Sequence, residues 1–138
     1  DGVLVVDGQV TRDTTIIETN GKKSHRASDG SILMITGDMM HFEEFIKWFE
    51  RSVDKPPKLI SSDNSSTKIV VLSKDGLWEY DSDGYAPVSA PFAAWGSGST
   101  VAFTAMHLGA SAREAVELAA KIDIYTGGDI TEMGLDPL

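Results

Sequence analysis

Residues that could take part in chemistry stand at the ends of apolar or helical stretches of this sequence. Asp7 follows a short apolar run and Lys23 precedes another, while Ser97, Asp123 and Thr126 flank helical segments. Together they supply two carboxylates, an ammonium group and two hydroxyls, which are groups that serve in acid–base and nucleophilic chemistry. None of them belongs to a short motif that is specific by itself.

Several kinds of site are excluded by what the sequence lacks. It has no phosphate-binding loop, no zinc-ligand spacing and no nucleophile elbow. It has no cysteine, which excludes disulfides, thiolate metal sites and a cysteine nucleophile within these residues. The histidines at 25, 41 and 107 are scattered, and we interpret them as surface or packing residues.

The composition is that of one globular domain over residues 1–138, with 41% hydrophobic and 24% charged residues. The net charge of −9 argues against nucleic acid or an anionic membrane as a partner. We find no apolar run of about 20 residues and no export signal, so the expected location is the cytoplasm.

Hydrophobic patterning predicts alternating blocks of strands and helices. Short apolar or alternating runs bounded by turn signals predict strands over 2–6, 13–18, 22–27, 31–36, 68–73, 77–80 and 130–133. Helical spacing predicts helices over 38–52, over 98–108 and behind a capping box at Ser111–Glu114. Residues 54–67 are interpreted as a linker, and the prolines at 87 and 91 as part of a loop.

Two of these helices carry an apolar stripe. The first is capped by Asp38, and its stripe is expected to pack on a sheet, with Trp48 off the stripe. That stripe consists of Phe42, Phe45, Ile46 and Phe49. The corresponding face of the third helix consists of Ala115, Leu118, Ala119 and Ile122. Since strands and helices do not alternate one by one, the order predicts an α+β protein with antiparallel sheets.

The order of the polar motifs is more specific than any one of them. An Asp-Gly closes the first strand, a lysine precedes a buried strand, and Gly37 opens the first helix. Trp95-Gly96-Ser97-Gly98-Ser99 opens the second helix, and Asp123-Ile124-Tyr125-Thr126-Gly127-Gly128 follows the third. This order resembles the proteasome β-subunit family and its bacterial HslV-type peptidases, over nearly the whole chain. The resemblance implies an N-terminal nucleophile hydrolase with a four-layer α-β-β-α sandwich.

The resemblance also implies roles for individual residues. The family's nucleophile is an N-terminal threonine whose α-amine acts as the base. Lys23 matches the catalytic lysine, Asp7 the carboxylate that holds it, and Gly37 the backbone donor of the oxyanion hole. Ser97, Asp123 and Thr126 match the polar set around the terminal amine. In many relatives backbone carbonyls at this turn bind a cation; here they would belong to Ala120, Asp123 and Thr126. A structural Na⁺ or Mg²⁺ is the cofactor that this implies, and none is required for the reaction.

Each match has a simpler alternative. Asp7 could serve as a turn residue, Lys23 as a solvated lysine, and Ser97 as a helix N-cap. Asp123 could end a helix, although an acid there opposes the helix dipole. The glycines at 127 and 128 could form an ordinary turn.

Two departures from the family stand out. Relatives carry a Thr-led strand of six to ten residues before the position of Gly2, and the sequence starts at Asp1. We therefore expect a missing first strand that pairs with residues 2–6. The family's second helix is replaced by the linker over 54–67, which leaves ring size and a closed chamber open. In this the chain resembles compact proteasome-like proteins of bacteria and their phages more than a full HslV subunit.

The leading hypothesis is a threonine-type peptidase or related amidohydrolase that acts on polypeptides as a homo-oligomeric ring. The resemblance also allows an ATP-dependent unfoldase as a partner. The alternatives are a catalytically silent proteasome-fold protein with an assembly or binding role, and an unrelated α+β binding domain. Subunit contacts are expected on helices 38–52 and 98–108. Candidates for that surface, or equally for the core, are Met39, Met40, Trp48 and Met106.

Overall fold

The computed structural model describes residues 2–12, 14–51, 56–57, 59 and 67–135. Every strand pairing among these residues is antiparallel, so the predicted α+β class with antiparallel sheets is confirmed. Contacts group the chain into two compact units. The single domain over 1–138 stays a prediction.

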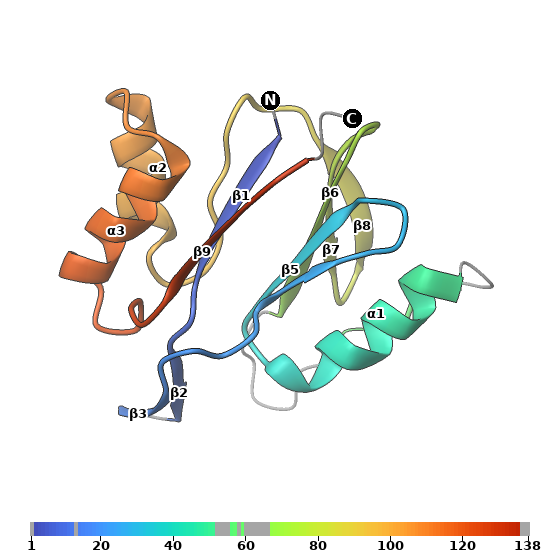
Figure 1. Ribbon diagram of the computed structural model, residues 1–138, viewed down its shortest axis with the longest axis horizontal. Helices are drawn as coiled ribbons and strands as arrows, with labels where there is room; N and C mark the ends of the chain where they lie inside the picture. Colours follow the sequence, from blue (N-terminus) through green and yellow to red (C-terminus); the bar gives the residue numbers. More distant parts are fainter. Residues whose placement is uncertain (1, 13, 52–55, 58, 60–66, 136–138) are drawn as a thin grey trace. The chain divides into compact units, whose positions relative to one another are not determined.

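The first unit comprises residues 24–89 together with Gly2 and Leu135, and contains a five-stranded sheet and one helix (Figure 1). The strands follow in the order β4 (Ser24–Arg26), β5 (Ile32–Thr36), β6 (Lys68–Ser73), β7 (Gly76–Asp81) and β8 (Gly84–Val88). A 3-10 turn, η1 (Met39–His41), leads into α1 (Phe42–Arg51). Asp38 caps this turn as predicted, since its carboxylate accepts a hydrogen bond from the Met40 N–H at 3.1 Å. The predicted linker lies largely outside the described residues.

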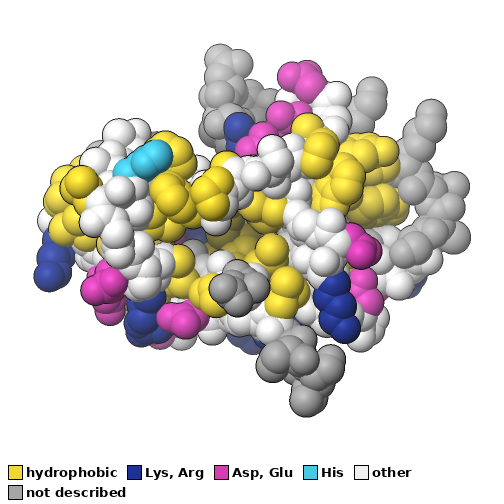
Figure 2. All heavy atoms as spheres, turned by 90° about the horizontal axis from the view of Figure 1, so that it is seen from above, with side chains coloured by type: hydrophobic (Ala, Val, Ile, Leu, Met, Phe, Trp, Pro, Cys, Tyr) yellow, Lys and Arg dark blue, Asp and Glu magenta, His cyan; other side chains and the backbone are white. Residues whose placement is uncertain are grey.

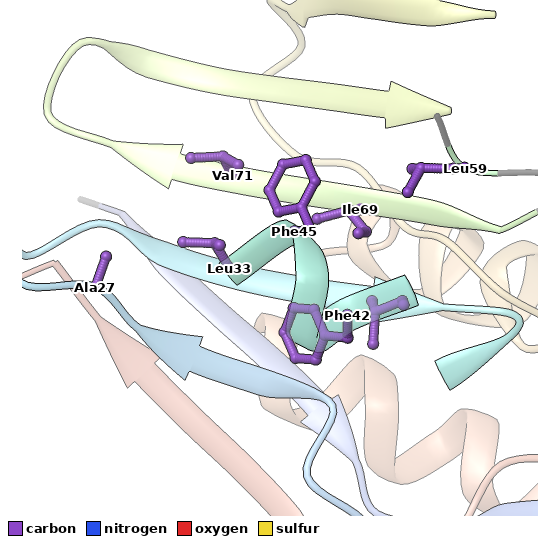
Figure 3. Packing of buried hydrophobic residues seen from close by; sticks show 8 residues of the cluster. Ala27, Leu33, Phe42, Phe45, Leu59, Ile69 and Val71 are labelled. Carbon is purple, nitrogen blue, oxygen red and sulfur yellow. The ribbon is translucent and has the colours of Figure 1, made fainter. Parts of the chain in front are cut away.

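The core of the first unit lies between α1 and one face of the sheet. Phe42 and Phe45 extend from α1 among apolar side chains of β5 and β6 (Figure 3). Ile46 and Phe49 pack against the same cluster, which confirms the predicted stripe. Trp48 was expected off the stripe, but its large indole also reaches the core, with its ring centroid 5.2 Å from that of Phe45.

Residues 84–88 form strand β8, whereas the glycine and proline there had predicted a loop. It is an edge strand of the sheet, paired on one side with β7. Pro87 lacks an N–H, and proline is tolerated on an edge strand, where one side of the backbone needs no partner. The turn signal at Asp83-Gly84 is real, but it joins two strands.

The second unit comprises residues 3–23 and 90–134 and holds two short sheets and two helices. Strand β1 (Val3–Asp7) pairs with β9 (Ile130–Gly134), and α3 (Ala112–Ile122) contacts both strands. Strand β2 (Val10–Arg12), which the sequence did not predict, pairs with β3 (Thr15–Glu18). Helix α2 (Ser99–His107) packs against α3. No described helix is long and apolar enough to cross a membrane.

The buried face of α3 is narrower than its sequence predicted. Ala115 and Ala119 are buried against two alanines of α2, and the capping box at Ser111–Glu114 is present as predicted. Leu118 and Ile122, expected on the same face, are exposed. Small alanines allow the two helices to approach closely, which turns the larger side chains at the margin of the stripe outward.

Candidate functional site

The second unit brings five of the predicted site residues to two neighbouring groups at the turn over 123–128. Asp7 ends β1, and Lys23 precedes β4 in the chain. Ser97 precedes α2, Asp123 is the C-cap of α3, and Thr126 lies in the turn itself.

Asp7 and Lys23 form a mostly buried ion pair. The Lys23 Nζ lies 2.8 Å from Asp7 Oδ1, and the two side chains are only 17% and 16% exposed. The predicted contact between them is therefore confirmed, and a fully solvated Lys23 is excluded. The other carboxylate oxygen of Asp7 accepts a hydrogen bond from the Gly127 N–H at 3.0 Å. Asp7 thus holds an ammonium group and anchors the turn at the same time.

Asp123 collects two hydroxyl groups on one carboxylate oxygen. Ser97 Oγ donates to Asp123 Oδ2 at 2.5 Å, and Thr126 Oγ1 donates to the same atom at 2.6 Å. The N-cap of α2 is Gly98, with no side-chain cap, so the alternative of Ser97 as a capping residue is wrong. A Cβ on Gly98 would lie 2.8 Å from Thr126 Oγ1, which explains why a glycine stands there.

The environment of Asp123 favours its charged form. Burial opposes ionisation, but hydrogen bonds from Ser97, Thr126 and the Tyr125 backbone outweigh it and hold the pKa of Asp123 below its ordinary value. The carboxylate is therefore ionised at neutral pH, and each hydroxyl keeps its oxygen lone pairs for a further donor.

This lowered pKa makes Asp123 stabilising above its ordinary pKa of 3.8, a contribution that is lost as the pH falls through the lower pKa of the folded state. We expect the free-energy difference of unfolding between wild type and Asp123→Asn to narrow between about pH 5 and about pH 2. Urea titrations at each pH measure it. Removing both donors (Ser97→Ala with Thr126→Val) should reduce the same pH dependence, and a gap that stays constant with pH would contradict the assignment.

Gly37 and Ala120 are the remaining predicted site residues. Gly37 directly follows β5 in the first unit, and its oxyanion role stays a prediction. Ala120 lies in the last turn of α3, where carbonyls lack intrahelical partners and carry partial negative charge. The Asp123 carbonyl accepts the Thr126 N–H at 3.1 Å and retains a second lone pair.

These oxygen donors fit a hard cation such as Na⁺ or Mg²⁺ in chemical type. The described residues contain no group of three or more His, Asp or Glu side chains placed to hold a metal. A cation at this turn would therefore depend on backbone carbonyls.

No contact was predicted for Gln9, and Gly127 was predicted only as part of a polar motif or of an ordinary turn. Gln9 is 6% exposed, and its Nε2 donates to the Ile124 carbonyl at 2.8 Å. The Gly127 carbonyl accepts the Gln9 N–H at 3.0 Å, in addition to its N–H contact with Asp7. The available signal was the polar Gln9 directly behind the Asp7-Gly8 turn.

Comparison with known proteins identifies relatives in fold. No protein-family model matches the chain, and neither does any curated protein. Among solved structures, Thiobacillus denitrificans BPH is similar with a TM-score of 0.71 and 21% identity, over 99% of this chain and 94% of that one. Thiobacillus denitrificans BPH in complex with epoxomicin matches with a TM-score of 0.71 and 22% identity, over 98% and 93%. At these identities the likeness is one of fold.

Proposed function

We propose that this protein is a threonine-type peptidase or related amidohydrolase of the proteasome-like family, with an N-terminal threonine as nucleophile. The observation that carries the proposal is the mostly buried Asp7–Lys23 ion pair, joined through Gly127 to the turn that bears Asp123 and Thr126. An ion pair between a strand end and a residue sixteen positions later is costly to bury without a use for its charge. A protein of similar fold binds epoxomicin, which further supports the proposal.

The proposed nucleophile is carried by a strand that precedes β1. In support, β1 pairs with β9 alone among the residues that the structure describes, so its other edge is open to a partner strand. Adding that strand is also a step toward the four-layer α-β-β-α sandwich that we propose for the complete protein.

The reaction follows from the proposed roles. The α-amine, with an ordinary pKa of about 8, takes the proton of the threonine hydroxyl as its oxygen attacks the acyl carbon. The Lys23 ammonium group favours the neutral amine and the developing alkoxide, and Asp7 holds this lysine in place. Ser97, Asp123 and Thr126 orient the amine. Gly37 supplies the oxyanion donor. The tetrahedral intermediate then collapses: its C–N bond breaks, and the leaving amine takes the proton from the α-ammonium group. Water attacks the resulting ester, which releases the carboxylic acid and restores the threonine hydroxyl.

We further propose a homo-oligomeric ring that acts on polypeptides. Exposed apolar side chains of the second unit support it, with Leu108 85%, Ile122 61% and Phe103 40% exposed. Figure 2 shows hydrophobic side chains at the surface beside a histidine, in the part of the chain that holds α2 and α3. Of the predicted contact residues, Met40 is 72% exposed, whereas Met39, Trp48 and Met106 pack against the cores. Light scattering of the complete protein tests the ring, and a mass near that of one chain would reject it.

Intact-mass analysis and N-terminal sequencing of the purified complete protein, with and without epoxomicin, test the enzymatic proposal. We expect an N-terminal threonine and a mass increase of one epoxomicin molecule located at that residue. A folded protein that stays unmodified, or that begins with a residue without a nucleophilic side chain, would instead favour the catalytically silent alternative.

A further inference from the structure

Gln9 connects the end of β1 to the turn over 123–128 by contacts that are separate from the Asp7–Lys23 pair. Its side-chain amide donates to the Ile124 carbonyl at 2.8 Å, across 115 positions of sequence. Its backbone N–H donates to the Gly127 carbonyl at 3.0 Å. The two acceptors bracket Thr126, so Gln9 holds the turn on both sides of the residue whose hydroxyl donates to Asp123.

The burial of Gln9 makes this connection obligatory. The residue is 6% exposed, and a buried amide without a partner is costly. The Ile124 carbonyl is therefore the group that the Gln9 amide requires in the folded chain. No other residue in β1, β2 or the link between them places an amide side chain there.

Gly127 is matched to the same amide. A Cβ at this position would lie 2.5 Å from Gln9 Oε1, closer than real Cβ atoms come to another heavy atom. Gly127 also donates its N–H to Asp7 Oδ2 at 3.0 Å. The backbone of Gly127 thus lies in contact with both Asp7 and Gln9, and a shift of one contact moves the other.

We propose that Gln9 is a positioning residue: its side-chain amide fixes the turn so that Thr126, Asp123 and the Asp7–Lys23 pair keep one mutual arrangement. Its effect on turnover rests on the proposed function, whereas its effect on the turn does not. Gln9 has no contact with reacting groups in this proposal and acts through Ile124 and Gly127.

The test uses two variants of the complete protein and two measurements. Gln9→Met keeps the side-chain length and removes the hydrogen bond, whereas Gln9→Glu presents a carboxylate that can donate to Ile124 only when protonated. For Gln9→Met we expect about a 10-fold loss of hydrogen-exchange protection at the Thr126 and Gly127 amides. We also expect modification by epoxomicin to slow by about 10-fold or more, since small misplacements of a reacting array are costly.

Gln9→Glu makes the hydrogen-exchange protection depend on pH, which would not happen if the side chain at position 9 only filled space. Its protection at Gly127 should recover as the pH falls from about 7.5 to about 4, because an acid with an ordinary pKa of about 4.3 becomes mostly protonated in this range and restores the donor. The control is Thr104→Val, which removes a 2.7 Å hydrogen bond from a side chain to the Thr100 carbonyl within α2. It should leave the turn and the modification rate unchanged.

The outcomes separate the two proposals. Unchanged protection in Gln9→Met, or equal loss in Thr104→Val, would overturn the positioning role. If wild type is not modified by epoxomicin while Gln9→Met loses protection, the proposed function fails and the role of Gln9 in the turn stands. Should Gln9→Met not fold, the pH-dependent recovery of Gln9→Glu decides, and its absence counts against the proposal.

Discussion

Replacing Lys23 with methionine should slow modification of the proposed terminal threonine by epoxomicin by about 10²–10⁴-fold, the range that a proton-transfer or charge partner contributes. Methionine keeps the length and apolar stem of lysine but removes its ammonium group. The amine base and the developing alkoxide then lose the nearby positive charge. The second-order rate of mass increase, measured on the complete protein, reports the effect.

The same change leaves Asp7 without its cation in a mostly buried place. Its side chain is 16% exposed, and among the residues that the structure describes it keeps only the hydrogen bond from the Gly127 N–H. We expect Lys23→Met to cost about 1–3 kcal/mol of stability, as is usual when one partner of a buried polar pair is lost.

Lys22→Met is the matched control, because it removes the same charge from the neighbouring, exposed position. It should change neither the stability nor the modification rate by more than a small factor. If the two variants were modified equally fast, Lys23 would be a structural lysine and the threonine-peptidase proposal would lose its main support. A folded Lys23→Met protein is required for the comparison, and the urea midpoint establishes it.

The Asp7–Lys23 contact was predicted from the resemblance to the proteasome-like family, together with the position of both residues beside apolar strands. The partners of Asp123 were less predictable. A serine just before a helix usually caps it, and only the folded chain shows that Gly98 takes the capping position while Ser97 donates to Asp123.

The contacts of Gln9 could not be predicted from the sequence, for a different reason. Its partner Ile124 is 115 positions away, and the acceptor is a backbone carbonyl, which any residue would supply. No residue type at position 124 signals that contact. Gly127 was visible in the sequence, but the sequence does not distinguish a glycine that is needed beside a buried amide from a glycine in an ordinary turn.

Two predictions about the fold were wrong, one at strand β8 and one at helix α3, because tertiary packing outweighed the local sequence pattern. Pro87 argued for a loop, but an edge strand such as β8 tolerates it. Periodicity placed Leu118 and Ile122 on the buried face of α3, yet alanines fill the contact with α2 and leave both exposed. The stripe of α1 was predicted correctly because phenylalanines dominate it, and burying such large apolar side chains in a core is strongly favourable.

That core leads to the second large effect: Phe45→Ala should destabilise the first unit by about 3–5 kcal/mol, the usual cost of removing a buried phenylalanine ring. Phe45 is 0% exposed, and its ring lies 4.9 Å from that of Tyr80 and 5.2 Å from that of Trp48. The variant loses the burial of the ring, its edge contact with Tyr80 and its tilted contact with Trp48, and it leaves a cavity in the core. A lower urea midpoint, followed by tryptophan fluorescence, measures the loss.

Phe103→Ala in α2 is the matched control, since it removes the same ring from a side chain that is 40% exposed. Partial burial predicts a cost of about 1–2 kcal/mol, well below that of Phe45→Ala. The ring of Phe103 contacts His107 and Phe92 at the surface. Removing this ring therefore leaves a surface depression that water can fill. Equal costs for the two variants in the isolated chain would mean that α1 does not hold the sheet through Phe45. A larger cost for Phe103→Ala, seen only when the protein is assembled, would instead locate that ring in a subunit contact.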